Sequence, residues 1–208
     1  MKMPQRDVSQ QGMDDVELAR ALIYGMLGRA LAEPWDAGFL ARLAKLDGDD
    51  GEVGTALRAV ATSARDVTVD VARTEYDALF IGVARGELVP YASFYLTGFL
   101  HERPLARLRA EMVALSLVRA GGRSDPEDHI ATECEVMATL IGRGSVDAQA
   151  GFFERHLAPW AGRFFTDLER AASASLFRPI GTLGRLMMDL DRQGFALAAG
   201  ALMDKGAA

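Results

Sequence analysis

The sequence predicts an all-α protein that folds as a single-domain helical bundle. Apolar residues recur at intervals of three and four along nearly the whole chain, which is the helical period. Alternating β-branched residues, the mark of a strand, come closest at Val67, Val69 and Val71, and these lead directly into a helical segment. The breaks between helical stretches are too short for disordered linkers. They fall at residues 47–54, 82–90, 121–124 and 142–144.

The apolar spacing also indicates where individual helices lie. A flexible segment is expected over residues 1–13, and the helical domain over residues 14–208, with a first helix at roughly 14–32. The apolar face of that first helix is expected at Leu18, Leu22, Ile23, Met26 and Leu27. Later helices are indicated by these series: Leu105, Leu108, Met112 and Leu115; Ile130, Cys134, Met137 and Ile141; Trp160, Phe164 and Leu168; Leu183, Leu186, Met187 and Leu190.

A strong local helix start is predicted at Asp125. An aspartate can accept hydrogen bonds from exposed amides as an N-cap, and Pro126 would fix the first turn. Glu127 and Asp128 would then lie in that first turn, where the helix dipole favours negative charge.

Composition and charge limit the classes to which this protein can belong. The net charge of −6 opposes general binding to nucleic acid, whose phosphates require a basic surface. Cys134 is the only cysteine, so the chain cannot form an intrachain disulfide. Residues 1–12 lack the apolar run of a signal peptide, and the longest apolar stretches are shorter than the roughly 18 residues needed to span a membrane. We therefore expect a soluble cytoplasmic protein without stable membrane insertion.

Residues that could carry catalysis or bind a metal do not form a recognisable set. His129 and Glu133 lie four apart, but a zinc site needs further ligands, and no Glu-x-x-His pair of the di-iron type occurs. Cys134 lies on an apolar stripe and is expected to be a small buried residue rather than a nucleophile. The glycine-rich segments lack the Gly-Lys-Ser/Thr ending of a phosphate loop. The sequence therefore predicts no catalytic residues, no metal, no cofactor and no enzyme.

Two stretches look instead like a surface for holding a peptide. Tyr76, Leu79 and Phe80 would ordinarily be core, but a glycine-bearing segment follows them and leads to Pro90, Tyr91 and Ser93, where aromatic residues crowd together. The second stretch carries Glu127, Asp128 and His129. On residue chemistry alone, Asp128 either completes a helix cap, with His129 fixing the loop, or receives arginine side chains from a ligand. The two interpretations are compatible.

At these residues the chain resembles the TorD/DmsD family of molybdoenzyme-maturation chaperones, with NarJ as a more distant relative. The family's first motif matches Tyr76, Leu79-Phe80, Gly82 and Pro90-Tyr91-Ala92-Ser93. Its second motif, Glu-Pro-x-Asp-His-Ile, matches Asp125-Pro126-Glu127-Asp128-His129-Ile130. A third similarity runs from Phe153 through Trp160 to Leu168 and Phe177. The resemblance covers roughly residues 15–190, with Asp125 in place of glutamate and Tyr76 where some members have tryptophan.

The resemblance implies a cytoplasmic chaperone of TorD-like fold that binds the apo form of a molybdenum-cofactor redox enzyme. Its ligand would commonly be an N-terminal twin-arginine signal peptide, held during cofactor insertion before export or assembly. The implied peptide-binding residues are Tyr76, Leu79, Phe80, Pro90, Tyr91, Ser93, Glu127, Asp128 and His129. Asp128 and Glu127 would take the cationic end of the peptide, and the aromatic group its apolar part. The chaperone would be a monomer or a domain-swapped homodimer.

Three alternatives stay open from the sequence. The first is a NarJ-like assembly factor for a redox subunit that is never exported, which would bind a peptide without the two arginines. The second is an enzyme or nucleotide-binding protein within a helical fold. The third is a helical adaptor with a closed groove, in which Tyr76 and Tyr91 would be fully buried.

Overall fold

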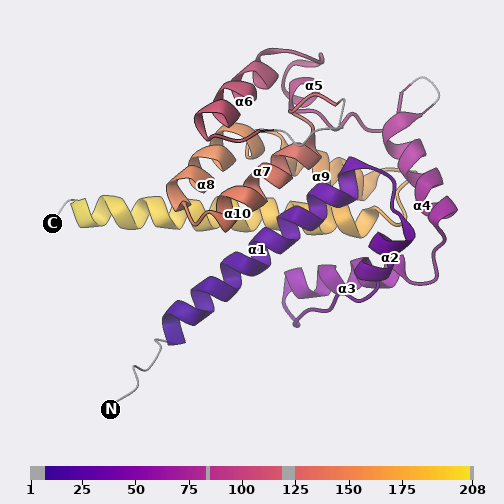
Figure 1. Ribbon diagram of the computed structural model, residues 1–208, viewed down its shortest axis with the longest axis horizontal. Coiled ribbons are helices and arrows are strands. Elements are labelled where there is room, and N and C mark those ends of the chain that lie inside the picture. The colour runs from indigo at the N-terminus through magenta and orange to yellow at the C-terminus, as the bar shows by residue number, and fades with distance from the viewer. Residues whose placement is uncertain (1–7, 83–84, 119–124, 207–208) are drawn as a thin grey trace.

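The computed structural model describes residues 8–82, 85–118 and 125–206, and it is helical (Figure 1). The elements in chain order are α1 (Val8–Ala32), α2 (Ala37–Leu43), α3 (Glu52–Ala64), α4 (Val69–Tyr76), η1 (Asp77–Ile81), α5 (Ala92–Thr97), α6 (Arg103–Ala114), α7 (Ile130–Gly142), α8 (Val146–Phe152), η2 (Phe153–Leu157), α9 (Ala161–Arg170) and α10 (Arg178–Gly206). The segments η1 and η2 are single π-helical turns that continue α4 and α8. The described residues form no strand, and their one β-type contact is an isolated bridge between Tyr91 and His129. The all-α prediction is confirmed.

The helices pack around α1, α7, α9 and α10. α1 lies against α7, while α9 and α3 both lie against α10. Figure 1 shows α2 and α3 on one side of the crossing of α1 and α10, and α5 to α8 on the other. Within the described residues, every helix is too short or too polar to traverse a bilayer.

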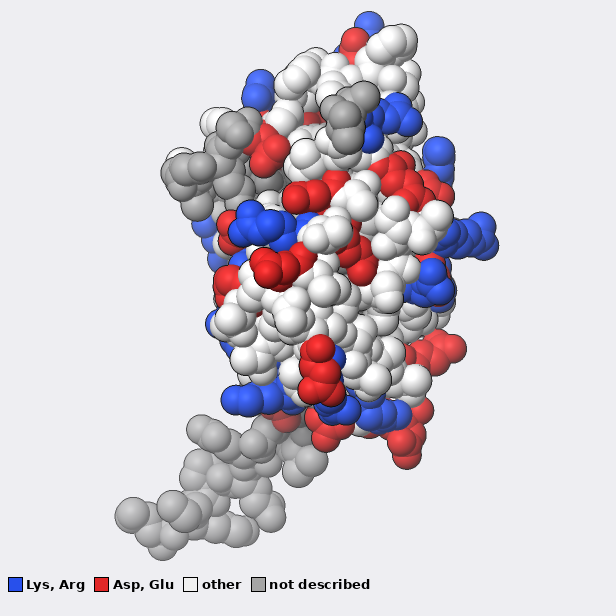
Figure 2. Space-filling model, turned by 90° about the vertical axis from the view of Figure 1, so that its right-hand side faces the viewer, with Lys and Arg blue, Asp and Glu red and all other residues white. Residues whose placement is uncertain are grey.

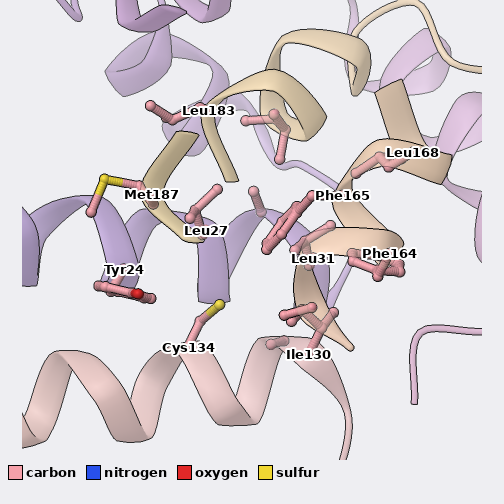
Figure 3. Packing of buried hydrophobic residues seen from close by; sticks show 14 of the residues in the cluster. Tyr24, Leu27, Leu31, Ile130, Cys134, Phe164, Phe165, Leu168, Leu183 and Met187 are labelled. Carbon is pink, nitrogen blue, oxygen red and sulfur yellow. The ribbon is translucent and has the colours of Figure 1, made fainter. Parts of the chain in front are cut away.

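The core forms where these four helices meet, and Figure 3 shows its centre. Tyr24, Leu27 and Leu31 of α1 are buried there together with residues from the three other helices. Those residues are Ile130 and Cys134 of α7, Phe164, Phe165 and Leu168 of α9, and Leu183 and Met187 of α10. The expected burial of Cys134 is confirmed, and burial raises the pKa of its thiol.

Two helix predictions need correction. α1 begins at Val8, earlier than the start expected near residue 14; residues 1–7 lie outside the described part of the chain. The predicted face of α1 is also partly wrong. Leu18 and Leu22 are 60% and 65% exposed, and the buried face runs instead through Tyr24, Leu27 and Leu31.

The predicted start of the helix at Asp125 is wrong as well. α7 begins at Ile130, and its N-cap is His129, whose Nδ1 accepts a hydrogen bond from the Ala131 amide at 3.1 Å. Residues 125–128 form a turn, closed by a bond from the His129 amide to the Pro126 carbonyl. Glu127 and Asp128 therefore precede the helix and do not lie in its first turn. The break predicted at residues 121–124 lies outside the described residues.

Candidate functional site

The two sequence motifs meet in space through backbone hydrogen bonds. The Ala92 amide donates to the Asp128 carbonyl, and the Ile130 amide donates to the Pro90 carbonyl, both at 2.9 Å. These bonds make Tyr91 and His129 an antiparallel bridge pair. Their rings meet edge to face, with centroids 4.9 Å apart. We call the paired segments 90–93 and 125–130 the motif junction.

Asp128 lies inside the motif junction and its side chain is almost fully buried. One carboxylate oxygen, Oδ2, accepts hydrogen bonds from the Ser93 amide at 2.8 Å and from the Ser93 hydroxyl. The other oxygen, Oδ1, is buried without a hydrogen-bond partner among the described residues. The carboxylate thus fixes the start of α5 against the turn before α7, and in this conformation solvent does not reach it.

The exposed side of the junction carries an acidic and aromatic group. The Tyr91 hydroxyl donates to Asp125 Oδ1 at 3.0 Å, and Tyr91 is half-buried. Burial, followed by the adjacent Asp125 carboxylate, raises the pKa of Tyr91 far above its ordinary value. Glu127 is partly exposed and pairs with Arg109 of α6 at 2.7 Å. The tyrosine is therefore a neutral hydrogen-bonding group at physiological pH, and the acids beside it are already partnered.

The aromatic residues of the first motif pack inward on the start of α10. The rings of Tyr76 and Phe80 lie 6.1 and 5.6 Å from the ring of Phe177, which in turn lies 4.4 Å from Trp35. Leu79 is fully buried, Tyr76 is 7% exposed and Phe80 is half-buried. These residues support the junction from beneath, and Phe80 alone of the three keeps a substantial exposed surface.

The glycine turn between the two parts of the first motif is required by its geometry. Gly82 has φ +62° and ψ 178°, and a Cβ there would come within 2.1 Å of the Arg85 carbonyl oxygen. The Gly82 amide closes η1 by donating to the Asp77 carbonyl at 2.7 Å. The chain then returns, and the Leu88 amide donates to the Leu79 carbonyl at 2.8 Å. This return connects η1 with Pro90, which is buried at the motif junction.

Of the nine predicted peptide-binding residues, the structure brings Pro90, Tyr91, Ser93, Glu127, Asp128 and His129 directly together. Tyr76 and Phe80 pack with Phe177 in the preceding segment, where Leu79 is fully buried. The closed-groove alternative required both Tyr76 and Tyr91 to be fully buried. Tyr76 meets that condition, whereas Tyr91 does not.

Sequence reasoning missed several exposed apolar residues that follow the two parts of the first motif. Ile81 follows Phe80 and is 58% exposed, while Leu96, Phe99 and Leu100 at the end of α5 are similarly exposed. Phe99 and Leu100 follow the left-handed Gly98, so they belong to no helical stripe. An apolar pair directly after a helix-ending glycine is the signal that could have identified them. Figure 2 shows the side of the molecule that carries α4, where acidic and basic groups are scattered around an uncharged area.

Glu133 is the remaining polar residue beneath the junction. It is almost fully buried on α7, and its Oε2 accepts from Trp160 Nε1 at 3.0 Å. Its position four residues after His129 had suggested a test for metal binding. Across the described residues, histidine, cysteine and carboxylate side chains do not gather in groups that could hold a metal ion. Glu133 serves as the buried acceptor that joins α7 to Trp160 at the start of α9.

Replacing Glu133 with glutamine is expected to stabilise the protein, and increasingly so as the pH rises. Burial raises the pKa of Glu133 well above its ordinary value. The hydrogen bond from Trp160 acts against this rise, and the negative charge of Asp128 adds to it. Since the folded state holds this proton more tightly than the unfolded state, wild-type stability falls as pH rises above about 4.5. A glutamine at position 133 keeps an oxygen that can accept the Trp160 hydrogen bond, and its side chain does not bind or release a proton. We therefore expect the stability difference in favour of Glu133→Gln to be larger at pH 8 than at pH 5.

Urea denaturation of both proteins at pH 5 and pH 8 measures this difference. Glu135→Gln, on the same helix but half-buried, is the matched control. A Glu133→Gln variant that is less stable than wild type at pH 8 would contradict this prediction. It would show that the buried carboxylate is ionised and that its surroundings stabilise the negative charge.

Comparison with known proteins identifies the family. Residues 45–166, more than half of the chain, match the family model described as nitrate reductase delta subunit. The chain belongs to this family. The expected kinship with the TorD/DmsD and NarJ chaperones is thereby confirmed.

Individual relatives agree with this membership. The chain is 27% identical over 131 residues to chaperone protein TorD of Vibrio atlanticus (strain LGP32), covering 57% of this chain and 61% of the relative. It is 28% identical over 98 residues to chaperone protein TorD of Aliivibrio fischeri (strain ATCC 700601 / ES114), covering 41% and 46%. The aligned part thus spans less than two thirds of these relatives. A solved structure from Archaeoglobus fulgidus, described as a redox enzyme maturation protein, shares the fold with TM-score 0.55 and 18% identity, covering 82% of this chain and 93% of that one.

Proposed function

We propose that this protein is a maturation chaperone for a molybdenum-cofactor redox enzyme and acts by binding the N-terminal segment of the apoenzyme. The family membership supports the chaperone class, since the curated relatives that match are chaperones and not enzymes. The observation that carries the proposal is the motif junction itself. Two segments more than thirty residues apart are joined by paired backbone bonds and by the Ser93–Asp128 contact, leaving Tyr91 half-exposed beside Asp125.

The nine candidate residues would divide their work according to their exposure. Phe80, Tyr91 and Glu127 have surface available for direct contact with a peptide. Tyrosine suits this position because its ring packs against apolar side chains while its hydroxyl stays hydrogen-bonded. The buried members, which are Tyr76, Leu79, Pro90, Ser93, Asp128 and His129, would hold the contact residues in place. An arginine of the ligand would meet Glu127 and Asp125 before it could reach Asp128.

Affinity capture from the native cytoplasm, with mass spectrometry, would name the client. We then expect a 30-residue peptide from that client's N-terminus to bind the chaperone in calorimetry, and Tyr91→Ala to weaken this binding at least tenfold. Val60→Ala on α3, a change in the core away from the junction, is the control for nonspecific loss of stability. A Tyr91→Ala variant with unchanged affinity would remove the junction from the proposed site.

The second candidate is an assembly factor for a redox subunit that is not exported. The description of the matching family, nitrate reductase delta subunit, favours this possibility. Changing both arginines of the client peptide to alanine distinguishes the two. A twin-arginine chaperone would lose at least tenfold in affinity, whereas an assembly factor that reads only the apolar part would bind undiminished.

A further inference from the structure

α10 ends in an apolar run that is largely exposed. Residues 195–203 are uninterrupted apolar residues, and the C-terminal end of α10 extends past α1 and α8 (Figure 1). Within this run residues 196–200 are exposed, and Leu197 is 75% exposed. A helix that is apolar on all sides is normally buried. The described part of the chain leaves the run uncovered, which indicates a contact with another molecule.

A hollow lies directly beside the start of this apolar run. Its volume is about 490 Å³, and its walls come from α1, α8 and α10, with Val53 of α3. Phe195 and Ala198 of the run line it, as does Leu190, which is 48% exposed. On the α1 side Val16 lines it and is 59% exposed. An exposed run and a mainly apolar hollow therefore adjoin on one surface. We call residues 16–23 of α1 and 187–205 of α10 the α1–α10 strip.

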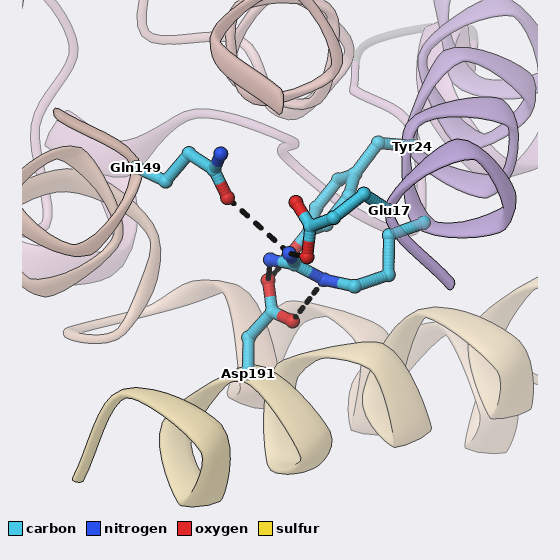
Figure 4. Close-up of polar contacts among 5 residues, drawn as sticks. Glu17, Tyr24, Gln149 and Asp191 are labelled. Atoms are coloured by element: carbon cyan, nitrogen blue, oxygen red, sulfur yellow. Dashed lines mark hydrogen bonds and ion pairs between the residues drawn. The ribbon is translucent and has the colours of Figure 1, made fainter. Parts of the chain in front are cut away.

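Polar side chains connect the helices that form the hollow. Arg20 of α1 donates to both carboxylate oxygens of Asp191 of α10, each at 3.0 Å, and to Gln149 of α8 at 3.2 Å (Figure 4). The Tyr24 hydroxyl donates to Asp191 at 2.7 Å, and Glu17 accepts a hydrogen bond from Arg20 at 2.5 Å. These bonds link α1, α8 and α10 at the wall of the hollow, so the hollow is part of the folded structure.

The α1–α10 strip is close to electrical neutrality. Its charged residues are four acids and three bases, namely Glu17, Asp189, Asp191 and Asp204, and Arg20, Arg192 and Lys205. Arg20 pairs with Glu17 and Asp191, and Arg192 pairs with Asp189 at 3.2 Å. An anionic membrane surface would require a basic face, which the strip does not have. The whole chain carries a net charge of −6, so contact between two copies is favoured where like charges are few.

We propose that the α1–α10 strip binds the same strip of a second copy of this chain, giving a two-fold symmetric dimer without exchange of segments. A two-fold axis lays the apolar run of each copy against the hollow of the other, because run and hollow adjoin on one surface. Leu190 and Leu197 would then be covered in both copies, and α1 and α10 of the two chains would pack as four helices. The inference goes beyond the proposed function, since it uses none of the residues of the motif junction.

The size of the strip indicates how stable this dimer is. At 1.5 Å per residue the part of α10 from residue 187 to residue 203 is about 24 Å long, and two helices side by side are about 20 Å wide. The contact would therefore cover roughly 500 Å² of each copy, compared with about 800 Å² in a standard interface. We expect a weak dimer that dissociates on dilution in the micromolar range.

Sedimentation equilibrium over a dilution series tests the dimer. We expect the measured mass of the wild type to rise from one chain towards two between about 1 and 200 μM protein. Leu197→Asp and Leu190→Asp place a charge at exposed positions of the strip, and each is expected to raise the dissociation constant of the dimer at least tenfold. Val113→Asp makes a comparable change on α6, at a position that is 77% exposed, and is expected to behave as the wild type. Circular dichroism verifies that each variant keeps the helix content of the wild type.

Three results would overturn the inference. The first is a wild type that keeps the mass of one chain over the whole series. The second is a dissociation constant that rises less than tenfold in both strip variants, as expected of a dimer formed by segment exchange or through another surface. The third is a monomeric wild type that binds vesicles of phosphatidylcholine and phosphatidylglycerol while Leu197→Asp does not, which would assign the apolar run to a membrane surface.

Discussion

Replacing Glu75 with alanine is expected to lower the free energy of unfolding by about 3–5 kcal/mol. Glu75 is the last residue but one of α4 and is only 9% exposed, and its carboxylate accepts three backbone amides of the segment just before α10. The donors are Ser175 at 2.7 Å, Leu176 at 3.0 Å and Phe177 at 2.8 Å. Each bond to a charged acceptor contributes about 1.5–3 kcal/mol, and the amides of Leu176 and Phe177 would be left buried without a partner.

The destabilisation caused by Glu75→Ala should extend to the motif junction. Phe177, which Glu75 holds, is the surface on which Tyr76 and Phe80 pack. Urea denaturation followed by circular dichroism measures the stability. Glu75→Gln keeps one acceptor oxygen and should fall between wild type and Glu75→Ala, and the exposed Glu154→Ala is the control. A loss below about 1 kcal/mol for Glu75→Ala would mean that the three amides find other acceptors.

Replacing Asp128 with alanine is expected to lower stability by about 2–4 kcal/mol and to weaken binding of the client peptide as a consequence. The Ser93 amide and hydroxyl would lose their shared acceptor in a site that excludes water. The start of α5 would then no longer be fixed to the turn before α7, and Tyr91 would move with it. Because Asp128 lies outside any helix, helix content measured by circular dichroism should change little.

The asparagine variant distinguishes positioning from direct contact. The asparagine side chain of Asp128→Asn keeps an oxygen for Ser93 but carries no charge, so a positioning role predicts that this variant retains most of both stability and peptide affinity. A direct contact with ligand arginine predicts that Asp128→Asn keeps stability and loses affinity. Ser93→Ala removes only the hydroxyl and keeps the amide that donates to Asp128. It should therefore lower stability and peptide affinity less than Asp128→Ala does. Retention of full peptide affinity by Asp128→Ala would exclude both roles.

The sequence predicted the helical fold well because periodicity reports burial directly. The residues Leu105, Leu108 and Met112 and the series Trp160, Phe164 and Leu168 are buried as expected. Leu115 is only partly buried, and Leu190 is 48% exposed. α1 was harder, because its apolar residues cover two sides and only one side faces α7. Periodicity alone does not say which of two apolar stripes a neighbour will cover.

Within the candidate site, sequence reasoning found the members but not their orientation. The pattern Asp125-Pro126 satisfies the usual rule for a helix start, yet His129 performs the capping because the Ile130 amide is already bound by the Pro90 carbonyl. That bond comes from a distant segment of the chain and leaves no local trace. Asp128 is buried for the same reason, since Ser93 arrives from the other motif.

The single cysteine is a built-in chemical probe of how often the fold opens. Cys134 is inaccessible at the centre of the core, and its thiol is held in the unreactive protonated form. Alkylation of the folded protein can therefore proceed only when α1 and α7 separate, so its rate reports how often that separation occurs. The same protection means that a second cysteine introduced on the exterior can be labelled selectively with a fluorophore, without first removing the native one.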